Sequence, residues 1–264
     1  KAVWKIQAAL ALIFLLNPFL GVLSTLFFVF VSKEKSMAFY LVIILTLFMW
    51  CLQSTRSFHL GEPSDWAGNY YYNFHNAAIT DTLTYLFFTT KEYAWQAFNL
   101  IGYYLFDGDF LSYANFIVAL TYMFTFAAIY KFWNYIQADP RFLVASLCLF
   151  AFVTEVNGIC NNLLRQQFAM SMMLYAIIER CTNGRILYPL LVISFFTHTM
   201  TGFFIPFLFI RLGKKASFRF YIYIVLGFGL LYILFTNLSI FSSSSFYAFQ
   251  RLATASNAYA LKDI

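Results

Sequence analysis

The sequence predicts an all-α fold, a polytopic bundle of transmembrane helices that includes short or re-entrant segments. Of its 264 residues, 62% are hydrophobic and only 11% are charged, which is more apolar surface than one water-soluble core could bury. Uncharged runs at residues 37–53, 110–130 and 220–250 approach or exceed the ~20 residues that a helix needs to cross a bilayer. We expect residues 1–264 to form one polytopic membrane domain.

The basic residues predict how the chain is oriented. The formal charge is +6, but the basic residues fall in short clusters between apolar runs, so we expect no nucleic-acid partner. The positive-inside rule places such clusters on the cytoplasmic side. Each stretch between two clusters must then cross the membrane an even number of times. The clusters are Lys33/Lys35, Lys131/Arg141, Arg180/Arg185 and Arg211/Lys214/Lys215/Arg219.

The N-terminal run, residues 1–31, lacks a small-residue cleavage site, so we expect a membrane segment and not a signal peptide. Asn17-Pro18 interrupts it. Proline at this position is compatible with a kink in one long tilted helix or with the turn of a short hairpin.

By alternation, the longest polar stretch forms an outer loop at about residues 54–92. Residues 77–106 carry scattered charges and are expected to form surface-lying or re-entrant helices. Asp107-Gly108-Asp109 predicts an outer turn, and a tail at about residues 242–264 falls on the same side.

Between Arg141 and Arg180, the same rule predicts one span outward, at about residues 142–157, and one span back that begins near Arg165. Arg165 therefore sits at the outer end of its helix. Between Arg185 and Arg211, one crossing outward and one crossing back must fit into residues 186–210.

The two crossings within residues 186–210 predict two short helices that meet near His198 and Gly202. Each arm would reach only ~20 Å at ~1.5 Å per residue, which is short of a ~30 Å hydrocarbon core. The apex should then line an outward-facing, water-filled cavity. The rival interpretation is one continuous helix, which would place the following basic cluster outside.

Two ionisable residues at membrane depth are the strongest candidates for function. Arg165 offers a planar set of donors that suits a phosphate or pyrophosphate. Its structural alternatives are snorkelling to lipid headgroups or an ion pair with Glu155. His198 is suited to act as a base near neutral pH, and its alternative is a buried histidine bonded to a backbone carbonyl.

Weaker candidates lie in the outer loop. Asp65 is surrounded by Trp66 and residues 70–72, all tyrosines, a mixture that could bind a sugar. Loop aspartates are usually only solvated, and tyrosines often form the interfacial belt. Glu92 and Asp109 stand at a helix end and a turn, where charges need no special cause. The four cysteines, Cys51, Cys148, Cys160 and Cys181, show no CxxC pairing and predict neither a metal site nor a disulfide framework.

These residues lie in motifs that resemble the EpsG family of bacterial exopolysaccharide synthesis, which is grouped with Wzy-type O-antigen polymerases. The first motif is Asn162-Leu163-Leu164-Arg165-Gln166-Gln167-Phe168-Ala169, followed by a basic turn and then Phe196-Thr197-His198-Thr199. Upstream, Asp65 with Asn69-Tyr70 is similar to the family's Asp-x-x-x-Tyr outer loop. Lys91-Glu92-Tyr93 stands where the family often has an acidic residue and proline, and this chain lacks the proline.

The resemblance implies a fold related to GT-C membrane glycosyltransferases, in the bacterial cytoplasmic (inner) membrane, with the active site facing the extracytoplasmic side. It implies a metal-independent polymerase that needs no cofactor. One glycan would pass from undecaprenyl pyrophosphate to the non-reducing-end hydroxyl of a second lipid-linked repeat unit. The implied partners are the undecaprenyl-pyrophosphate-linked oligosaccharide, the lipid bilayer and a chain-length regulator protein. A lipid-linked oligosaccharide flippase, a glycan ligase and an O-acyltransferase are the alternatives.

Under that resemblance, Arg165, helped by Arg251 of the outer tail, neutralises charge on the departing pyrophosphate. His198 or Asp65 removes the proton of the acceptor hydroxyl, with Glu155 as a third candidate base. Gln166, Tyr70 and Glu92 are expected to bind substrate.

Overall fold

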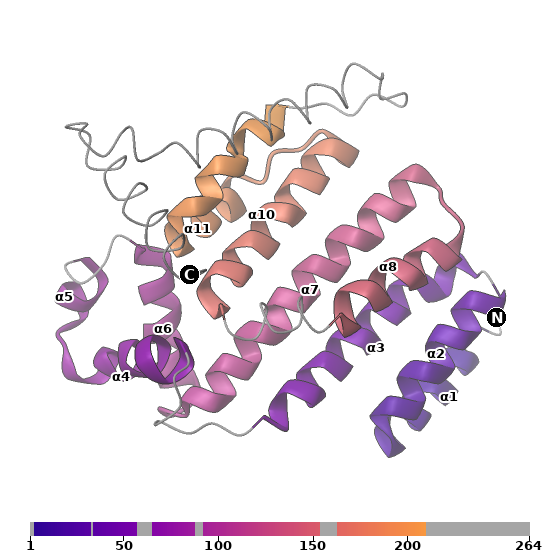
Figure 1. Ribbon diagram of the computed structural model, residues 1–264, viewed down its shortest axis with the longest axis horizontal. Helices are drawn as coiled ribbons and strands as arrows, with labels where there is room; N and C mark the ends of the chain where they lie inside the picture. Colours follow the sequence, from indigo (N-terminus) through magenta and orange to yellow (C-terminus); the bar gives the residue numbers. More distant parts are fainter. Residues whose placement is uncertain (1–2, 33, 57–64, 88–91, 154–162, 210–264) are drawn as a thin grey trace, which may run out of the picture. The chain divides into compact units, whose positions relative to one another are not determined.

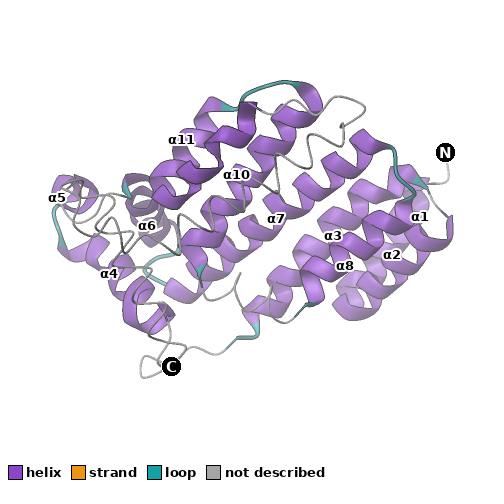
Figure 2. Cartoon of the chain, turned by 45° about the horizontal axis from the view of Figure 1, so that its top comes forward, coloured by secondary structure: helices purple, strands orange, loops and turns teal. Residues whose placement is uncertain are grey.

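The computed structural model describes residues 3–32, 34–56, 65–87, 92–153 and 163–209, and the secondary structure in these ranges is helical throughout (Figure 1, Figure 2). The predicted all-α class is therefore confirmed. Residues 1–211 form one compact unit, to which all of the following observations belong. One domain over residues 1–264 remains a prediction. Several features named above lie outside the described residues: the run 220–250, the tail 242–264, the cluster 211–219, Lys33, Lys91, Glu155, Cys160 and Arg251.

Three long helices form the centre of the bundle: α3 (Lys35–Ser54), α7 (Phe110–Ile136) and α10 (Leu164–Asn183). Helix α7 lies between the other two and packs extensively against both (Figure 1). Fully buried alanines stand on all three, at Ala38, Ala114 and Ala169 among others. Small side chains let helix backbones approach closely, which is how helices pack in a membrane. Helices α3 and α7 are each long and apolar enough to cross one.

The N-terminal run is a hairpin, which decides between the two interpretations of Asn17-Pro18. Helix α1 (Val3–Leu16) ends at Leu16 and α2 (Pro18–Ser32) begins with the proline, whose missing N–H costs nothing there. A Cβ at Gly21 would lie 2.3 Å from Cα of Phe14. Residues seven apart in one helix cannot meet in this way, so α1 and α2 fold back on each other with glycine at the close approach.

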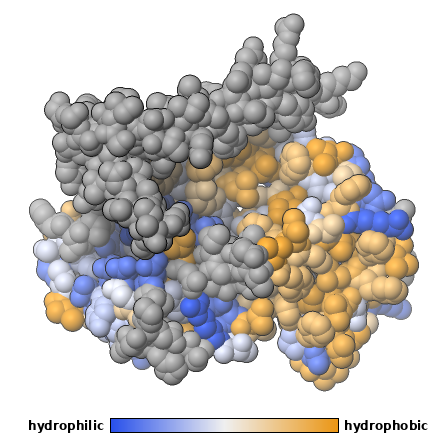
Figure 3. Space-filling model, in the orientation of Figure 1, coloured by the Kyte–Doolittle hydropathy of each residue, from blue (hydrophilic) through white to orange (hydrophobic). Residues whose placement is uncertain are grey.

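One flank of the unit exposes large apolar side chains. Figure 3 shows a hydrophobic surface over α1–α3 and α8 (Pro140–Phe152). Leu15, Phe27 and Phe142 are each more than two-thirds exposed there. An apolar surface of this extent is typical of contact with lipid. Together with the composition and the two long apolar helices, it describes a membrane protein.

The described part of the polar stretch 54–92 is folded into short helices, and its place on the outer side of the membrane stays a prediction. It contains η1 (Trp66–Tyr70), α4 (Tyr71–Ile79) and α5 (Thr82–Phe87), and α6 (Tyr93–Leu105) follows. The short helices predicted for residues 77–106 are confirmed. Aromatic side chains stabilise these helices, because Trp66, Phe74 and Tyr85 are fully buried and give the segments a core to pack on.

The predicted turn at Asp107-Gly108-Asp109 is confirmed. Asp107 and Gly108 have φ of 52° and 76°, in the left-handed region that aspartate and glycine tolerate. The Asp109 carboxylate then accepts hydrogen bonds from the backbone N–H groups of Leu111 and Ser112, at 3.0 and 3.4 Å. Asp109 is therefore the N-cap of α7, and this role accounts for its charge.

The predicted break at His198 is also confirmed. Helix α11 (Tyr188–Thr197) stops there, and an eleven-residue 3₁₀ helix, η2 (Thr199–Phe209), follows. Arg180, in the last turn of α10, donates from Nε to the carbonyl of Leu208 at 3.0 Å, so η2 returns to the end at which α11 began. A 3₁₀ helix rises ~2.0 Å per residue against ~1.5 Å for an α-helix, which lets this short arm run alongside most of α10.

The basic clusters gather at one end of the bundle, as predicted. Lys35 Nζ lies 2.6 Å from Oε1 of Gln137, and Arg141 Nε lies 3.4 Å from the carbonyl of Phe30. Lys131 lies near the same end of α7, five residues before the helix ends at Ile136. We call this the basic end, defined by Lys35, Lys131, Arg141, Arg180 and Arg185. Arg165 begins α10 and therefore lies at the opposite end, which we call the site end.

The outward span predicted at residues 142–157 is described only in part. Helix α8 runs from Pro140 to Phe152, with the Asp139 carboxylate accepting from the backbone N–H of Arg141 at 2.9 Å. Its 13 residues reach only ~20 Å.

Candidate functional site

The Glu92 carboxylate joins Arg165 and His198 at the site end. Its Oε2 lies 2.5 Å from Nη1 of Arg165, and its Oε1 lies 2.9 Å from Nδ1 of His198. The three residues come from the N-cap of α6, the first turn of α10 and the junction of α11 with η2. Because its two carboxylate oxygens contact different partners, this single side chain fixes the guanidinium and the imidazole relative to each other.

The three side chains differ in exposure. Glu92 and His198 are 14% and 15% exposed, whereas Arg165 is 31% exposed. A carboxylate this buried needs charged or hydrogen-bonded partners, and the two nitrogens supply them. Nε of Arg165 is buried and has no hydrogen-bond partner among the described residues. A guanidinium that spends one nitrogen on Glu92 keeps further donors for a second anion.

The imidazole of His198 is held by its backbone as well as by Glu92. The residue is extended, with φ −153° and ψ 112°, and it ends α11. Its carbonyl accepts from the backbone N–H and the hydroxyl of Thr201, at 3.0 and 2.9 Å. A carboxylate acceptor at Nδ1 places the ring proton there, which leaves Nε2 with a lone pair that can take a proton.

Helix α11 is anchored to α10 beside this site. Ser194 is fully buried and donates from Oγ to the carbonyl of Ala169 at 2.8 Å. A Cβ on Gly202 would lie 2.9 Å from the ring of Phe195, so glycine allows η2 to pass close to α11. These contacts fix the position at which His198 faces Arg165.

Tyr70 borders the site and brings Asp65 near it. Burial raises the pKa of the Tyr70 phenol to about 12, although the charge of Arg165 and a hydrogen bond from its backbone oppose this effect. The charges of Asp65 and Glu92 also act on the phenol. Tyr70 therefore stays protonated at neutral pH and remains a hydrogen-bond donor. Its ring packs edge-on against Trp95, with centroids 5.8 Å apart.

Asp65 itself is exposed at the N-cap position of η1, where its Oδ1 accepts from Nδ2 of Asn69 at 3.3 Å. Gln166 follows Arg165 in the first turn of α10 and is partly exposed. The other two outer-loop tyrosines are less central, since Tyr71 packs on His75 and Phe110. Tyr72 is 57% exposed.

The structure thus brings five sequence-predicted site residues to one end of the bundle: Asp65, Tyr70, Glu92, Arg165 and His198. The sequence did not predict that Glu92 bridges the other two. An arginine and a histidine at membrane depth require a counter-ion, so the sequence could predict a carboxylate partner but not which one. Trp95 was missed, although its Nε1 is buried with no hydrogen-bond partner in the described part of the chain. An orphan donor beside Tyr70 suits a polar ligand.

Comparison with known proteins supplies the family. The model of the EpsG family matches residues 39–262, which is most of the chain. The chain belongs to the EpsG family. The match spans the helices that carry Glu92, Arg165 and His198, and membership indicates a membrane protein of polysaccharide-polymerase type. No curated protein and no solved structure matches this EpsG protein. The relationship to GT-C glycosyltransferases stays a prediction.

Proposed function

We propose that this EpsG protein is a polysaccharide polymerase that acts on lipid-linked repeat units. It transfers an oligosaccharide from undecaprenyl pyrophosphate to the non-reducing-end hydroxyl of a second lipid-linked unit. The observation that carries the proposal is the Glu92 bridge, which fixes an anion-binding group and a base side by side at one end of a membrane bundle. Glycosyl transfer from a pyrophosphate requires this pair of groups.

Arg165 acts on the leaving group. As the bond between the sugar C1 and the pyrophosphate oxygen breaks, negative charge develops on that oxygen. The guanidinium is already held by Glu92, so its remaining donors need no reorganisation to meet that charge. The buried, unpartnered Nε supports this role, and the protonated phenol of Tyr70 adds a neutral donor beside it.

His198 acts on the acceptor. The acceptor oxygen forms the new bond to C1 and its proton passes to Nε2 of His198. The proton cannot go to Nδ1, because that nitrogen faces Glu92. We assign Glu92 a positioning role, in place of the substrate binding expected from the sequence. Asp65 remains the alternative base, and Gln166 remains a candidate for orienting sugar or phosphate.

The proposal includes a bacterial cytoplasmic membrane in which the basic end faces the cytoplasm and the site end faces outward. The positive-inside rule supports this orientation, since the described lysines and arginines of three clusters share one end. Cysteine labelling in intact cells would test it. A cysteine at the exposed Tyr72 should react with an impermeant reagent, whereas one at Gln137 should not.

Product length tests the activity. Purified protein with lipid-linked repeat units should build longer glycans and release undecaprenyl pyrophosphate. A flippase would only move the units between leaflets, a ligase would place glycan on another acceptor, and an acyltransferase would form no glycosidic bond. Finding any of these instead of lengthened glycan would refute the polymerase.

Two substitutions separate the candidate bases. His198→Ala should reduce turnover at least ~100-fold, which is the lower range for loss of a general base. Asp65→Asn should reduce it less, because Asp65 is exposed and bonds only its own helix in the contacts described. A reversed order would move the base to Asp65, and wild-type turnover in both would remove both assignments.

A further inference from the structure

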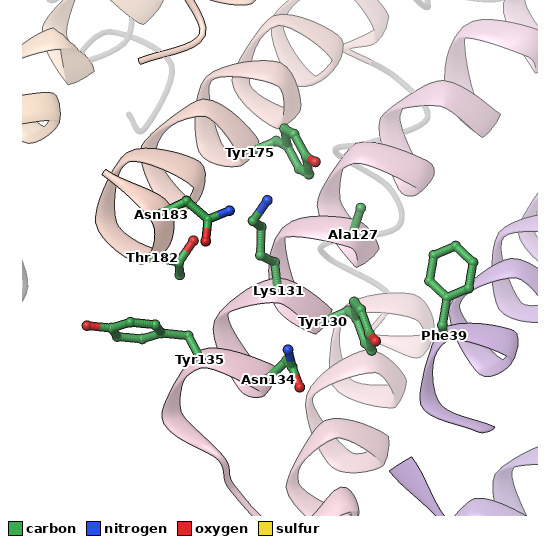
Figure 4. Close-up of a pocket in the computed structure, with 9 residues that line it drawn as sticks. All are labelled: Phe39, Ala127, Tyr130, Lys131, Asn134, Tyr135, Tyr175, Thr182 and Asn183. Carbon is green, nitrogen blue, oxygen red and sulfur yellow. The ribbon is translucent and has the colours of Figure 1, made fainter. Parts of the chain in front are cut away.

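A polar cavity lies at the basic end of the bundle, between α3, α7 and α10 (Figure 4). Its volume is about 400 Å³, and its walls come from α3, α7 and α10. Aromatic rings line it at Tyr130, Tyr135 and Tyr175, and the amides of Asn134 and Asn183 lie at its polar side. A cavity of this size can hold the headgroup of a lipid or a small metabolite.

Lys131 supplies charge to the cavity. In Figure 4 its side chain rises between α7 and α10 with Nζ among the lining residues. Nζ forms an ion pair with Oε2 of Glu179 and lies 5.4 Å from the ring centroid of Tyr175. An ammonium has three donors, and one acceptor oxygen uses only one of them.

The charge around the cavity is positive overall. Glu179 is already occupied, because its Oε1 accepts from Nδ2 of Asn183 at 2.9 Å while its Oε2 faces Lys131. Arg185 lies within electrostatic range of Lys131. Two cations and one carboxylate leave a surplus that attracts an anion.

The depth of the cavity favours a lipid over a soluble anion. Its lining lies in the last turns of α7 and α10 and the first turns of α3, where spanning helices reach the headgroup layer. Phe39 lines the cavity and is 55% exposed, so part of the cavity wall is an exposed apolar side chain on one of the two long apolar helices. Basic pockets between helices at this depth bind anionic headgroups.

We propose that this cavity binds the phosphate headgroup of an anionic phospholipid, with Lys131 as its charge and the tyrosine rings as its walls. The site is separate from the Glu92 site and does not rest on the polymerase activity. It lies toward the opposite end of α7 and α10 from Arg165.

Asn134→Asp tests the proposal without breaking the internal ion pair. Asn134 is exposed, so the variant should fold, and it places a negative charge at the cavity. Gln137→Glu is the matched control, with the same charge change at the same end but outside the lining. The full chain in detergent is mixed with equal amounts of phosphatidylglycerol and phosphatidylethanolamine, and native mass spectrometry counts the bound lipids.

We expect wild-type protein to retain phosphatidylglycerol in excess. Asn134→Asp should lower that excess about three- to tenfold, as expected for a unit charge a few ångströms from a phosphate. Gln137→Glu should leave it within about twofold. No preference in the wild type, or equal losses in both variants, would overturn the proposal. So would complete displacement of the lipid by excess inorganic phosphate, because the cavity would then be a site for a soluble anion.

Discussion

The two ends of the bundle each hold a buried carboxylate paired with a cation, and the two pairs are built differently. Glu179 and Lys131 stand on long helices α10 and α7, whose packing alone brings them together. Glu92 precedes the short helix α6 and reaches two partners on two other elements. A pair between packed helices serves mainly their packing. A carboxylate shared by an arginine and a histidine fixes two reactive groups, which is the arrangement of a site.

The largest expected effect separates Arg165 from the arginines of the basic end. Arg165→Ala should lower polymerase turnover by ~10²–10³-fold, as for loss of a preorganised donor to developing negative charge. Arg165→Lys should recover part of this, because an ammonium keeps the charge but loses the planar set of donors. Product-length assays measure both.

Arg141→Ala is the control for Arg165, since it also removes one arginine but at the basic end. It should retain turnover within about twofold. Folded, membrane-inserted Arg165→Ala protein that built long chains at the wild-type rate would show that Arg165 has no more effect on turnover than Arg141.

Glu92→Gln tests whether the shared carboxylate positions His198. Turnover should fall ~10- to 100-fold, less than for removal of the base itself. A merely structural role would lower the melting temperature and leave the turnover of the folded protein unchanged.

Glu179→Ala tests the other pair, and its effect should appear in stability. The variant leaves Lys131 without its carboxylate, and a buried ion pair that loses one partner typically costs 3–5 kcal/mol. Lys131 is 24% exposed, so we expect about 2 kcal/mol. Replacing both residues with methionine should restore most of the melting temperature in detergent. An unchanged midpoint in the single variant would show that the pair contributes nothing.

The smallest effect concerns Asp109, the cap of α7 at the site end. The Ser112 hydroxyl and backbone N–H groups lower the pKa of this carboxyl below its ordinary 3.8. Its stabilisation is therefore present above that value and is lost as the pH falls through the lower, folded-state pKa. Asp109→Ala should cost ~1 kcal/mol at neutral pH.

Asp109→Asn is the control, because asparagine is an equally good cap without a titrating charge. Melting temperatures recorded against pH should show wild type and Asp109→Ala converging in acid. Parallel curves down to the lowest pH at which the protein stays folded would contradict the capping role.

The positions of the charged residues predicted much of the fold correctly from the sequence. The positive-inside rule put Arg165 at the end opposite Lys131, and it favoured the break at His198 over one continuous helix. Both follow from local composition and from counting crossings. The N-terminal hairpin was left open, because Asn17-Pro18 suits a kink as well as a turn. What decides it is the contact of Gly21 with Phe14, which is a matter of tertiary packing.

The site was predicted as a set of residues but not as a geometry. Arg165, His198, Asp65 and Tyr70 were marked by their chemistry, whereas Glu92 gained its importance from a contact across 106 positions of the chain. No local pattern encodes such a contact. The helices that begin before residue 77, η1 and most of α4, were not predicted, for a related reason. Their sequence is polar and rich in tyrosine, and the burial of Trp66 and Phe74 that supports them is a matter of tertiary packing.

The unequal lengths of the helices also affect the surrounding lipid. Helices α1, α2 and α8, with 14, 15 and 13 residues, extend only ~20 Å along the apolar flank, against a hydrocarbon thickness of ~30 Å. Helix α7, with 27 residues, extends ~40 Å. Thinning of the membrane beside the short helices would relieve this mismatch, at a cost of fractions of a kcal/mol per ångström. Such a compressed zone would bring the two leaflets closer together beside the protein.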